Sequence, residues 1–244
     1  MEEIRLNKYL SEMGLCSRRE ADRLIESGKV MVDGAPEIKR MKIREGQAVV
    51  LNGKPVAGTF GPKPVLLAVN KPKGVVCTTS DKDRALNIVE MVGYPERVYP
   101  VGRLDKDSEG LIFLTNQGDL VNRIMRGANG HEKEYVVQVN KPVTEEFVKT
   151  METGIWLKEL NVTTKPCRIT VTGKQEFHII LTQGLNRQIR RMCDTCGYSV
   201  RSLVRIRIMN VHLGNLKTGT FRKVTRREYE TLTEMQENGS NFNS

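Results

Sequence analysis

The stretch "YPVGRLDKDSEGLIFLTN", residues 99–116, joins two apolar runs through a polar loop. Residues 98–101 and 111–114 are compact apolar runs bounded by glycine or polar residues, which predicts two short buried strands. The loop between them is therefore held at both ends. It carries Asp105 between two cations, which favour the ionised form of a carboxylate. The alternative interpretation is an ordinary loop aspartate that caps a turn.

Strand-like and helical runs alternate from residue 65 onward. Short strands joined both by tight turns and by helices predict an α+β fold with a mixed, largely antiparallel sheet flanked by helices. A length of 244 residues accommodates one large domain or a large and a small one. We expect the large domain to span residues 65–232 and the polar residues 233–244 to form a flexible tail.

The first 52 residues predict a separate small domain with two helices. The first helix can end at Gly14, and "SRRE", residues 17–20, is a capping box that starts the second. The segment "KVMVDGAP", residues 29–36, then predicts a strand and a tight turn. Residues 53–64 contain three glycines and three prolines without apolar periodicity, so we expect a linker there.

The segment "RLNKYLSEMGLCSRREADRLIESGKVMVDG", residues 5–34, resembles the S4 (αL) RNA-binding domain in the order and spacing of its elements. The resemblance implies that two helices and a small sheet present basic residues to the RNA backbone. A plain helical cap without RNA contacts is the alternative. The residues expected to contact RNA in this domain are Arg5, Lys8, Arg18, Arg19 and Arg23.

The basic residues of the chain are unevenly distributed. The net charge is 39 − 29 = +10, and residues 183–229 alone hold 11 Lys/Arg against 2 Asp/Glu. Dense arginine of this kind is typical of a nucleic-acid-binding surface, with a solubilising face as the alternative. No apolar run is long enough to cross a bilayer, and the first residues lack the apolar core of a signal peptide, so we expect a cytoplasmic protein without a membrane partner.

The five cysteines are odd in number and scattered, which indicates a reducing compartment rather than a disulfide framework. "CDTC", residues 193–196, is compatible with zinc or redox chemistry. Its two thiols nevertheless share a helical face with Ile189 and Met192, which favours core packing. The three histidines lie far apart in the sequence, and we expect no metal site.

Four polar motifs follow one another along the large domain: "NKPKGVVCT" (70–78), "GRLDKDSEGL" (102–111), "KEY" (133–135) and "GLNRQIRRM" (184–192). Together they resemble the pseudouridine synthases, in particular the branch with an N-terminal S4 domain that acts on ribosomal RNA. The resemblance covers residues 4–230, and its wording is most similar to the F-type enzymes of 23S ribosomal RNA. It implies cofactor-free isomerisation of uridine to pseudouridine by a monomer. Small-subunit ribosomal RNA and tRNA stay open as substrates.

The resemblance assigns a role to four residues. It implies that Asp105 is the catalytic carboxylate, acting as nucleophile or as base, and that Arg190 pairs with it. Tyr135 would stack on the uracil, and Arg103 would fill the place of the flipped base. The alternatives are a phosphate-binding helix face for Arg190 and an ordinary strand aromatic for Tyr135. Further expected RNA contacts are Asn70, Lys71, Lys73, Asn186 and Arg187.

Two rival functions come from other classes. A non-catalytic RNA-binding or ribosome-assembly factor would explain the S4 pattern and the arginine density without using Asp105. A carboxylate-dependent glycoside hydrolase would need a second acid beside Asp105, and it would leave the arginine density unexplained.

Overall fold

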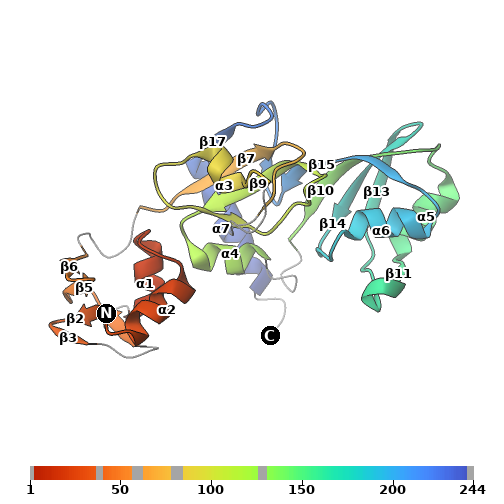
Figure 1. Ribbon diagram of the computed structural model, residues 1–244. Helices are drawn as coiled ribbons and strands as arrows, with labels where there is room; N and C mark the ends of the chain where they lie inside the picture. The colour runs from red at the N-terminus through yellow and green to blue at the C-terminus, as the bar shows by residue number, and fades with distance from the viewer. Residues whose placement is uncertain (1–2, 37–40, 57–62, 78–84, 126–130, 241–244) are drawn as a thin grey trace. The chain divides into compact units, whose positions relative to one another are not determined.

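The computed structural model describes residues 3–36, 41–56, 63–77, 85–125 and 131–240, and it divides into two compact units (Figure 1). The first unit contains the N-terminal residues up to Pro64, together with residues 95–97 and 116–118. The second unit contains the rest of the chain from Val65 onward. Within the described residues no helix is both long and apolar enough to cross a membrane.

Two helices and two small sheets build the N-terminal unit. Ser17 caps the second helix, because its side chain accepts a hydrogen bond from the Glu20 N–H at 3.2 Å, as the sequence predicted. Apolar residues from both helices and from three strands form a single buried cluster. The elements are β1 (Glu3–Arg5), α1 (Leu6–Glu12), α2 (Arg18–Glu26), β2 (Val30–Val32), β3 (Ala35–Pro36), β4 (Lys42–Arg44), β5 (Val49–Leu51) and β6 (Lys54–Pro55).

The predicted start of the linker at residue 53 is wrong. Strand β6 pairs with β5 around a tight turn at Asn52 and Gly53, which have φ angles of 51° and 75°. An Asn-Gly pair with two positive φ angles is the preferred two-residue hairpin turn. The sheet of the N-terminal unit therefore extends to Pro55, while residues 57–62 of the expected linker lie outside the described residues.

A nine-stranded sheet forms the centre of the second unit, in the order β13-β14-β10-β15-β9-β7-β17, with β8 paired to β9 and β16 to β15. Among the strand pairs of this sheet that the structure describes, β15–β9 alone is parallel, which confirms the mixed, largely antiparallel sheet. The strands are β7 (Leu66–Lys71), β8 (Tyr99–Val101), β9 (Glu109–Thr115), β10 (Lys133–Val139), β13 (Arg168–Gly173), β14 (Glu176–Leu181), β15 (Val200–Ile208), β16 (Val211–His212) and β17 (Phe221–Lys223), and a separate two-stranded sheet joins β11 (Trp156–Leu157) to β12 (Val162–Thr163).

Helices cover both faces of the sheet around β7 and β9. Alternate residues of these strands belong to different cores, as a period of two requires: Leu67 and Ile112 lie in one, Leu66 and Phe113 in the other. The first core includes residues of α3 (Ile88–Val92), and the second includes residues of α4 (Gly118–Met125) and α7 (Arg226–Ser240). Strand β9 is thus buried almost throughout, as its apolar run predicted, whereas in β8 only Val101 is buried and Tyr99 and Pro100 are half-buried.

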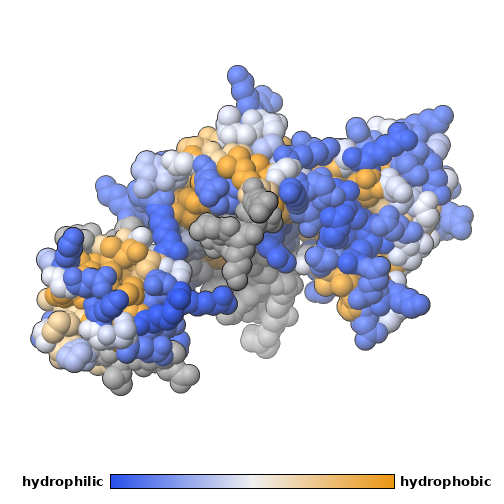
Figure 2. Space-filling view, viewed as in Figure 1, coloured by the Kyte–Doolittle hydropathy of each residue, from blue (hydrophilic) through white to orange (hydrophobic). Residues whose placement is uncertain are grey.

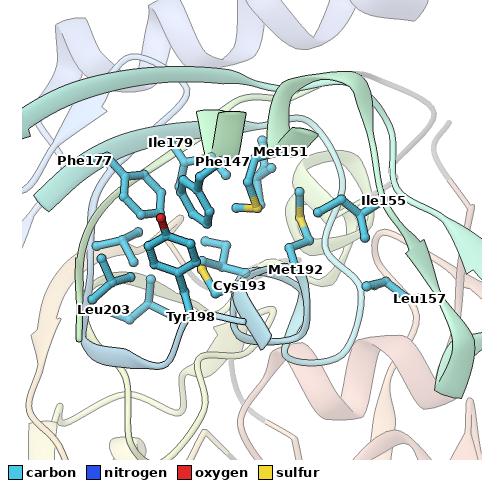
Figure 3. Packing of buried hydrophobic residues seen from close by; sticks show 14 residues of the cluster. Phe147, Met151, Ile155, Leu157, Phe177, Ile179, Met192, Cys193, Tyr198 and Leu203 are labelled. Carbon is cyan, nitrogen blue, oxygen red and sulfur yellow. The ribbon is translucent and has the colours of Figure 1, made fainter. Parts of the chain in front are cut away.

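A third core lies between α5 (Glu145–Thr153), α6 (Gln188–Thr195) and the β10–β14–β15 part of the sheet (Figure 3). The ring of Phe147 lies 5.4 Å from that of Phe177 and 4.2 Å from that of Tyr198, measured between centroids. Met192 and Cys193 are fully buried in it, which confirms the predicted packing face of α6. Hydrophilic residues dominate the surface over α5 and α6 (Figure 2).

The predicted flexible tail from residue 233 is wrong for most of its length. Helix α7 continues to Ser240, and Leu232 anchors it because this side chain is fully buried in the core shared with α4. Residues 241–244 lie outside the described part of the chain.

Candidate active site

A cavity of about 300 Å³ opens in the second unit between the β8–β9 loop, the loop before α6 and the strands β10, β14 and β15. This volume is at the lower end of the range for small-ligand sites. The walls combine apolar side chains with a few charged ones. The residues that the sequence singled out and that the fold brings together here are Arg103, Asp105, Tyr135, Asn186 and Arg187.

The β8–β9 loop holds Asp105 at the wall of this cavity. Leu104 is inserted into a hydrophobic core with 8% exposure, and its backbone N–H points to Cys77 Sγ at 3.4 Å. The N–H of Ser108 donates to the carbonyl oxygen of Asp105 at 3.1 Å and closes a turn. The Asp105 side chain remains 32% exposed. A buried neighbour and a closed turn thus fix the backbone of a carboxylate that can still meet a ligand.

Arg187 provides the nearest cation to Asp105. Its Nη1 lies 3.7 Å from Asp105 Oδ2, and its two terminal nitrogens donate to the two oxygens of Asp107 at 3.0 and 3.2 Å. The residue adopts a left-handed conformation, with φ of 51°, directly before α6. Gln188 is 4% exposed and accepts a hydrogen bond from the Leu185 N–H, which holds this loop in place.

The predicted pairing of Arg190 with Asp105 is wrong in this structure. Arg190 Nε lies 3.4 Å from Asp107 Oδ2, and its Nη2 donates to the Asp107 carbonyl oxygen at 3.1 Å. The same nitrogen is 3.4 Å from Ser108 Oγ. Arg190 lies three residues after Arg187, which enters the cavity, and it contacts Asp107 and Ser108 of the loop. Its side chain is only 12% exposed.

Asp107 is a charged residue of this site that the sequence reasoning missed. Hydrogen bonds from Arg187 lower the pKa of its carboxyl group, and the charge of Arg190 adds to this effect. The available signal was the spacing of "DKD", because residues two apart in a short loop can place both carboxylates near one cation. Asp105, Asp107, Arg187 and Arg190 therefore form one cluster of two acids and two arginines rather than a single ion pair.

Lys133 and Arg205 are two further cavity residues that the prediction did not name, although Lys133 stands in the "KEY" motif. Arg205 of β15 lies opposite Tyr135 of β10 in the antiparallel register, and its guanidinium carbon is 6.0 Å from the centre of the Tyr135 ring. Lys133 is two residues from Tyr135 on the same strand, so both point to the same face. Burial lowers the pKa of Lys133 to about 8, and the charge of Arg205 contributes.

Two of the predicted RNA contacts are wrong because their side chains are buried. Lys71 is fully buried, and its ammonium group donates to the carbonyl oxygens of Pro72 and Val75 at 2.9 and 2.8 Å. Asn70 is 7% exposed and donates to the Leu216 carbonyl oxygen at 2.8 Å. Both therefore hold backbone segments. Lys73 remains accessible, with its side chain 51% exposed and an ion pair to Glu109.

The basic residues of the N-terminal unit lie mostly at its surface. Arg5, Arg18, Arg19 and Arg23 are exposed, whereas Lys8 is half-buried and lies 3.8 Å from Glu12. Arg23 also forms an ion pair with Glu20 along α2. Arg18, Arg19 and Arg23 are therefore accessible on α2, beside the exposed Glu26, and Asn186 of the second unit is likewise exposed.

Among the described residues, no group of three or more histidine, cysteine, aspartate or glutamate side chains is arranged to hold a metal ion. All five cysteines are free thiols.

Comparison with known proteins follows the division of the chain. Residues 65–195 match the family model described as RNA pseudouridylate synthase, and residues 4–37 match the S4 domain. The first of these matches covers more than half of the chain. The chain belongs to the RNA pseudouridylate synthase family. It is accordingly an enzyme that isomerises uridine to pseudouridine in RNA.

Characterised relatives of this pseudouridine synthase match along nearly its whole length. The dual-specificity RNA pseudouridine synthase RluF of Escherichia coli strain K12 is 50% identical over 237 residues, which are 97% of this chain and 81% of the relative. Ribosomal large subunit pseudouridine synthase B of Bacillus subtilis strain 168 is 32% identical, covering 97% and 98% of the two chains. A crystal structure described as pseudouridylate synthase superposes with a TM-score of 0.69 at 28% identity, over 94% of this chain and 99% of that one.

Proposed function

We propose that the cavity binds a uridine extruded from folded RNA and that Asp105 is the carboxylate that acts on its sugar. The observation that carries this proposal is the position of Asp105 in a cavity wall that also contains Tyr135, within the segment matched to the family. An ionised carboxylate can attack C1′ or accept a proton from the sugar. Either role requires contact with the ribose, which the 32% exposure of the side chain permits.

Tyr135 and Arg103 also line this cavity and complete the proposed site. Tyr135 stacks on the uracil, since its ring is held between two hydrophobic cores and faces the cavity. Arg103 is exposed at the rim and takes the place of the extruded base in the RNA. Arg190 supports this site through the β8–β9 loop. Lys73, Asn186 and the exposed arginines of the N-terminal unit contact RNA outside the cavity.

We further propose that the substrate is a uridine of 23S ribosomal RNA and that the enzyme acts as a monomer in the cytoplasm. The similarity to the B-type enzyme of the large ribosomal subunit supports this class of RNA. The free thiols fit a reducing compartment.

Mapping pseudouridines in total RNA of cells with and without this protein tests the substrate. A site present in 23S ribosomal RNA only when the protein is made is the expected result. Dependent sites confined to 16S ribosomal RNA or tRNA would contradict the proposed substrate. The absence of any dependent site would favour the non-catalytic assembly factor.

The variant Asp105→Asn tests the role of the carboxylate. We expect single-turnover conversion to fall by at least about 10³-fold, the scale of losing a principal catalytic group, while RNA affinity changes by only a few fold. Asp194→Asn, an exposed aspartate of α6, is the matched control and should convert RNA normally. Normal turnover by Asp105→Asn would remove Asp105 from the mechanism.

A further inference from the structure

Arg205 is a buried arginine whose hydrogen-bonding capacity is only partly used. The residue is 4% exposed, and its Nε donates to the Leu111 carbonyl oxygen at 2.6 Å. Its Nη2 is buried and has no hydrogen-bond partner among the described residues. A buried N–H without an acceptor costs about 1 to 3 kcal/mol. Arg205 also lines the cavity, so a ligand bound there can offer an acceptor to its guanidinium group.

The backbone around Arg205 fixes the position of this donor. Strands β9 and β15 run parallel and meet where Gly110 lies beside Arg205. A Cβ on Gly110 would lie only 2.3 Å from the Arg205 carbonyl oxygen, and Gly110 has φ of +101°. Glycine therefore permits an approach that no other residue allows. Together with the bond to Leu111, this close approach holds the guanidinium at one place in the wall.

The face that carries Arg205 also carries the proposed stacking residue. Tyr135 lies opposite it on β10, and both line the same cavity as Asp105. A base stacked on Tyr135 presents its edge to the neighbouring wall. The edge of uracil carries two carbonyl oxygens, which accept hydrogen bonds, whereas cytosine carries an amino group in place of one of them. A guanidinium only donates, so an interaction with the oxygen on C4 would favour uracil over cytosine, which carries its amino group there.

Because the base turns during the reaction, one fixed donor can bind first one of its carbonyl oxygens and then the other. Breaking the C1′–N1 bond leaves its electron pair on the base, whose carbonyl oxygens then carry negative charge. The base turns about the axis through N3 and C6, which brings C5 to C1′ and exchanges the positions of O2 and O4. The new C5–C1′ bond forms, C5 loses its proton, and N1 gains one. A donor placed beside one oxygen before the turn is beside the other one afterwards.

From these observations we propose that Arg205 binds the edge of the extruded uracil, its guanidinium group donating to one carbonyl oxygen in bound uridine and to the other in bound pseudouridine. This inference rests on the proposed binding of an extruded uridine in the cavity. It adds a hydrogen bond that selects the base and stabilises the charge that develops on it.

A double-substitution cycle tests this hydrogen bond. The probe is a short RNA around a uridine that the wild-type protein converts, prepared with uridine, 2-thiouridine or 4-thiouridine at that position. Conversion of the uridine probe by the wild type is verified first, which separates this test from the proposed substrate. Sulfur is a weak acceptor, so it weakens a hydrogen bond at the replaced oxygen.

We expect Arg205→Gln to slow single-turnover conversion of the uridine probe by about 10- to 100-fold, the effect of one charged hydrogen bond. With at least one thio-substituted probe the same substitution should cost within about 3-fold, because the hydrogen bond is already weakened there. Equal reductions on all three probes would overturn the proposal. Arg168→Gln, an exposed arginine on β13 outside the cavity, is the matched control and should convert every probe at the wild-type rate.

Arg205→Lys keeps the experiment informative if the glutamine variant does not fold. Lysine retains the charge but has a single nitrogen, which cannot bind the Leu111 carbonyl oxygen and the base at once as a guanidinium group can. The proposal requires that Arg205→Lys also slows conversion of the uridine probe, and that this loss is smaller with the same thio-substituted probe as for Arg205→Gln. Wild-type rates for Arg205→Lys on every probe would overturn it as well.

Discussion

At the scale of single residues, one guanidinium holds two carboxylates at the centre of the site. Arg187 bridges Asp105 and Asp107, whereas Arg190 contacts Asp107, through its carboxylate and its backbone, and Ser108 but not Asp105. The two arginines lie three residues apart in one motif but differ in what they touch. Arg187 therefore orients a carboxylate that faces the cavity, and Arg190 holds the loop in its folded shape.

The two arginines should respond differently to the same substitution. We expect Arg187→Gln to slow conversion by about 10-fold or more with little change in melting temperature, because its partly exposed ion pairs stabilise the fold only weakly. Arg190→Gln should lower the melting temperature by several degrees, because the Arg190 side chain is largely buried and its loss removes hydrogen bonds to the Asp107 carbonyl oxygen and to Ser108 Oγ. Thermal denaturation and single-turnover assays of both variants measure this difference. Equal melting temperatures would contradict it.

Lys133 gives the site a pH dependence. Burial lowers the pKa of its ammonium group from 10.5 to about 8, and the charged groups that line the same cavity are Arg205, Asp105, Arg103 and Arg187. The group is a cation below this pKa and neutral above it. If its charge helps to hold the base, conversion decreases as the pH rises through about 8. Lys133→Arg keeps the charge and should remove this decrease.

Single-turnover rates between about pH 7 and pH 9.5 measure the effect. Lys149→Arg, an exposed lysine of α5, is the control and should retain the wild-type profile. The role of Lys133 would be excluded if the decrease persisted unchanged in Lys133→Arg.

At the scale of elements, the sequence predicted best where the signal was local. In "SRRE" Ser17 caps α2 as expected, and "TRRE" at residues 225–228 starts α7 with a complete capping box, in which Thr225 and Glu228 each accept from the backbone N–H of the other. The second instance was missed because the tail composition suggested fraying. The Asn52-Gly53 pair is likewise a local signal for a tight turn. It was assigned to the linker because of the glycine and proline content of the residues around it.

Residues defined by long-range pairing could not be predicted in this way. Arg205 and Lys71 resemble surface cations in the sequence, but the pairing of β7, β9, β10 and β15 buries both. Either Arg187 or Arg190 could have been the partner of Asp105. The left-handed conformation of Arg187, directly before α6, points this arginine to the cavity. Motif spacing gave the set of residues but not their partners.

Glu228 joins α7 to β17, and its charge should stabilise this junction. Hydrogen bonds from Arg222 lower the pKa of Glu228 to about 2, and Thr225 contributes further bonds. Because the pKa is lower in the folded than in the unfolded state, the stabilisation is present above about pH 4.5 and is lost as the pH falls towards 2. We expect Glu228→Gln to lower the free energy of unfolding at neutral pH by about 1 to 3 kcal/mol.

Chemical denaturation at neutral and acidic pH tests this stabilisation. The difference between wild type and Glu228→Gln should shrink as the pH falls towards about 2 to 3. Glu230→Gln is the matched control, since Glu230 pairs with Arg226 at an exposed position and should contribute little. A pH-independent difference would contradict the assigned role of the charge.

At the scale of the whole molecule, charge and chemistry are divided between two units. The active-site cavity lies entirely in the second unit, together with residues 183–229 and their excess of nine positive charges. Residues 1–60 carry 11 Lys/Arg against 9 Asp/Glu, a small excess, and three arginines of α2 are exposed. The N-terminal unit is thus suited to binding additional phosphates without supplying groups to the reaction.

Removal of residues 1–64 should therefore weaken RNA binding more than the chemical step. The cut precedes Val65, where the second unit begins. We expect the dissociation constant to rise by about 10-fold or more, and its dependence on salt to become shallower, by a slope of about 0.7 to 0.9 for each phosphate that the shortened chain no longer neutralises. Conversion at saturating RNA should stay within about 10-fold of the full chain. Binding titrations at several salt concentrations and single-turnover assays measure both quantities. An unchanged affinity with an unchanged salt slope would mean that the N-terminal unit does not bind the substrate, and abolished conversion at saturating RNA would mean that it takes part in forming the site.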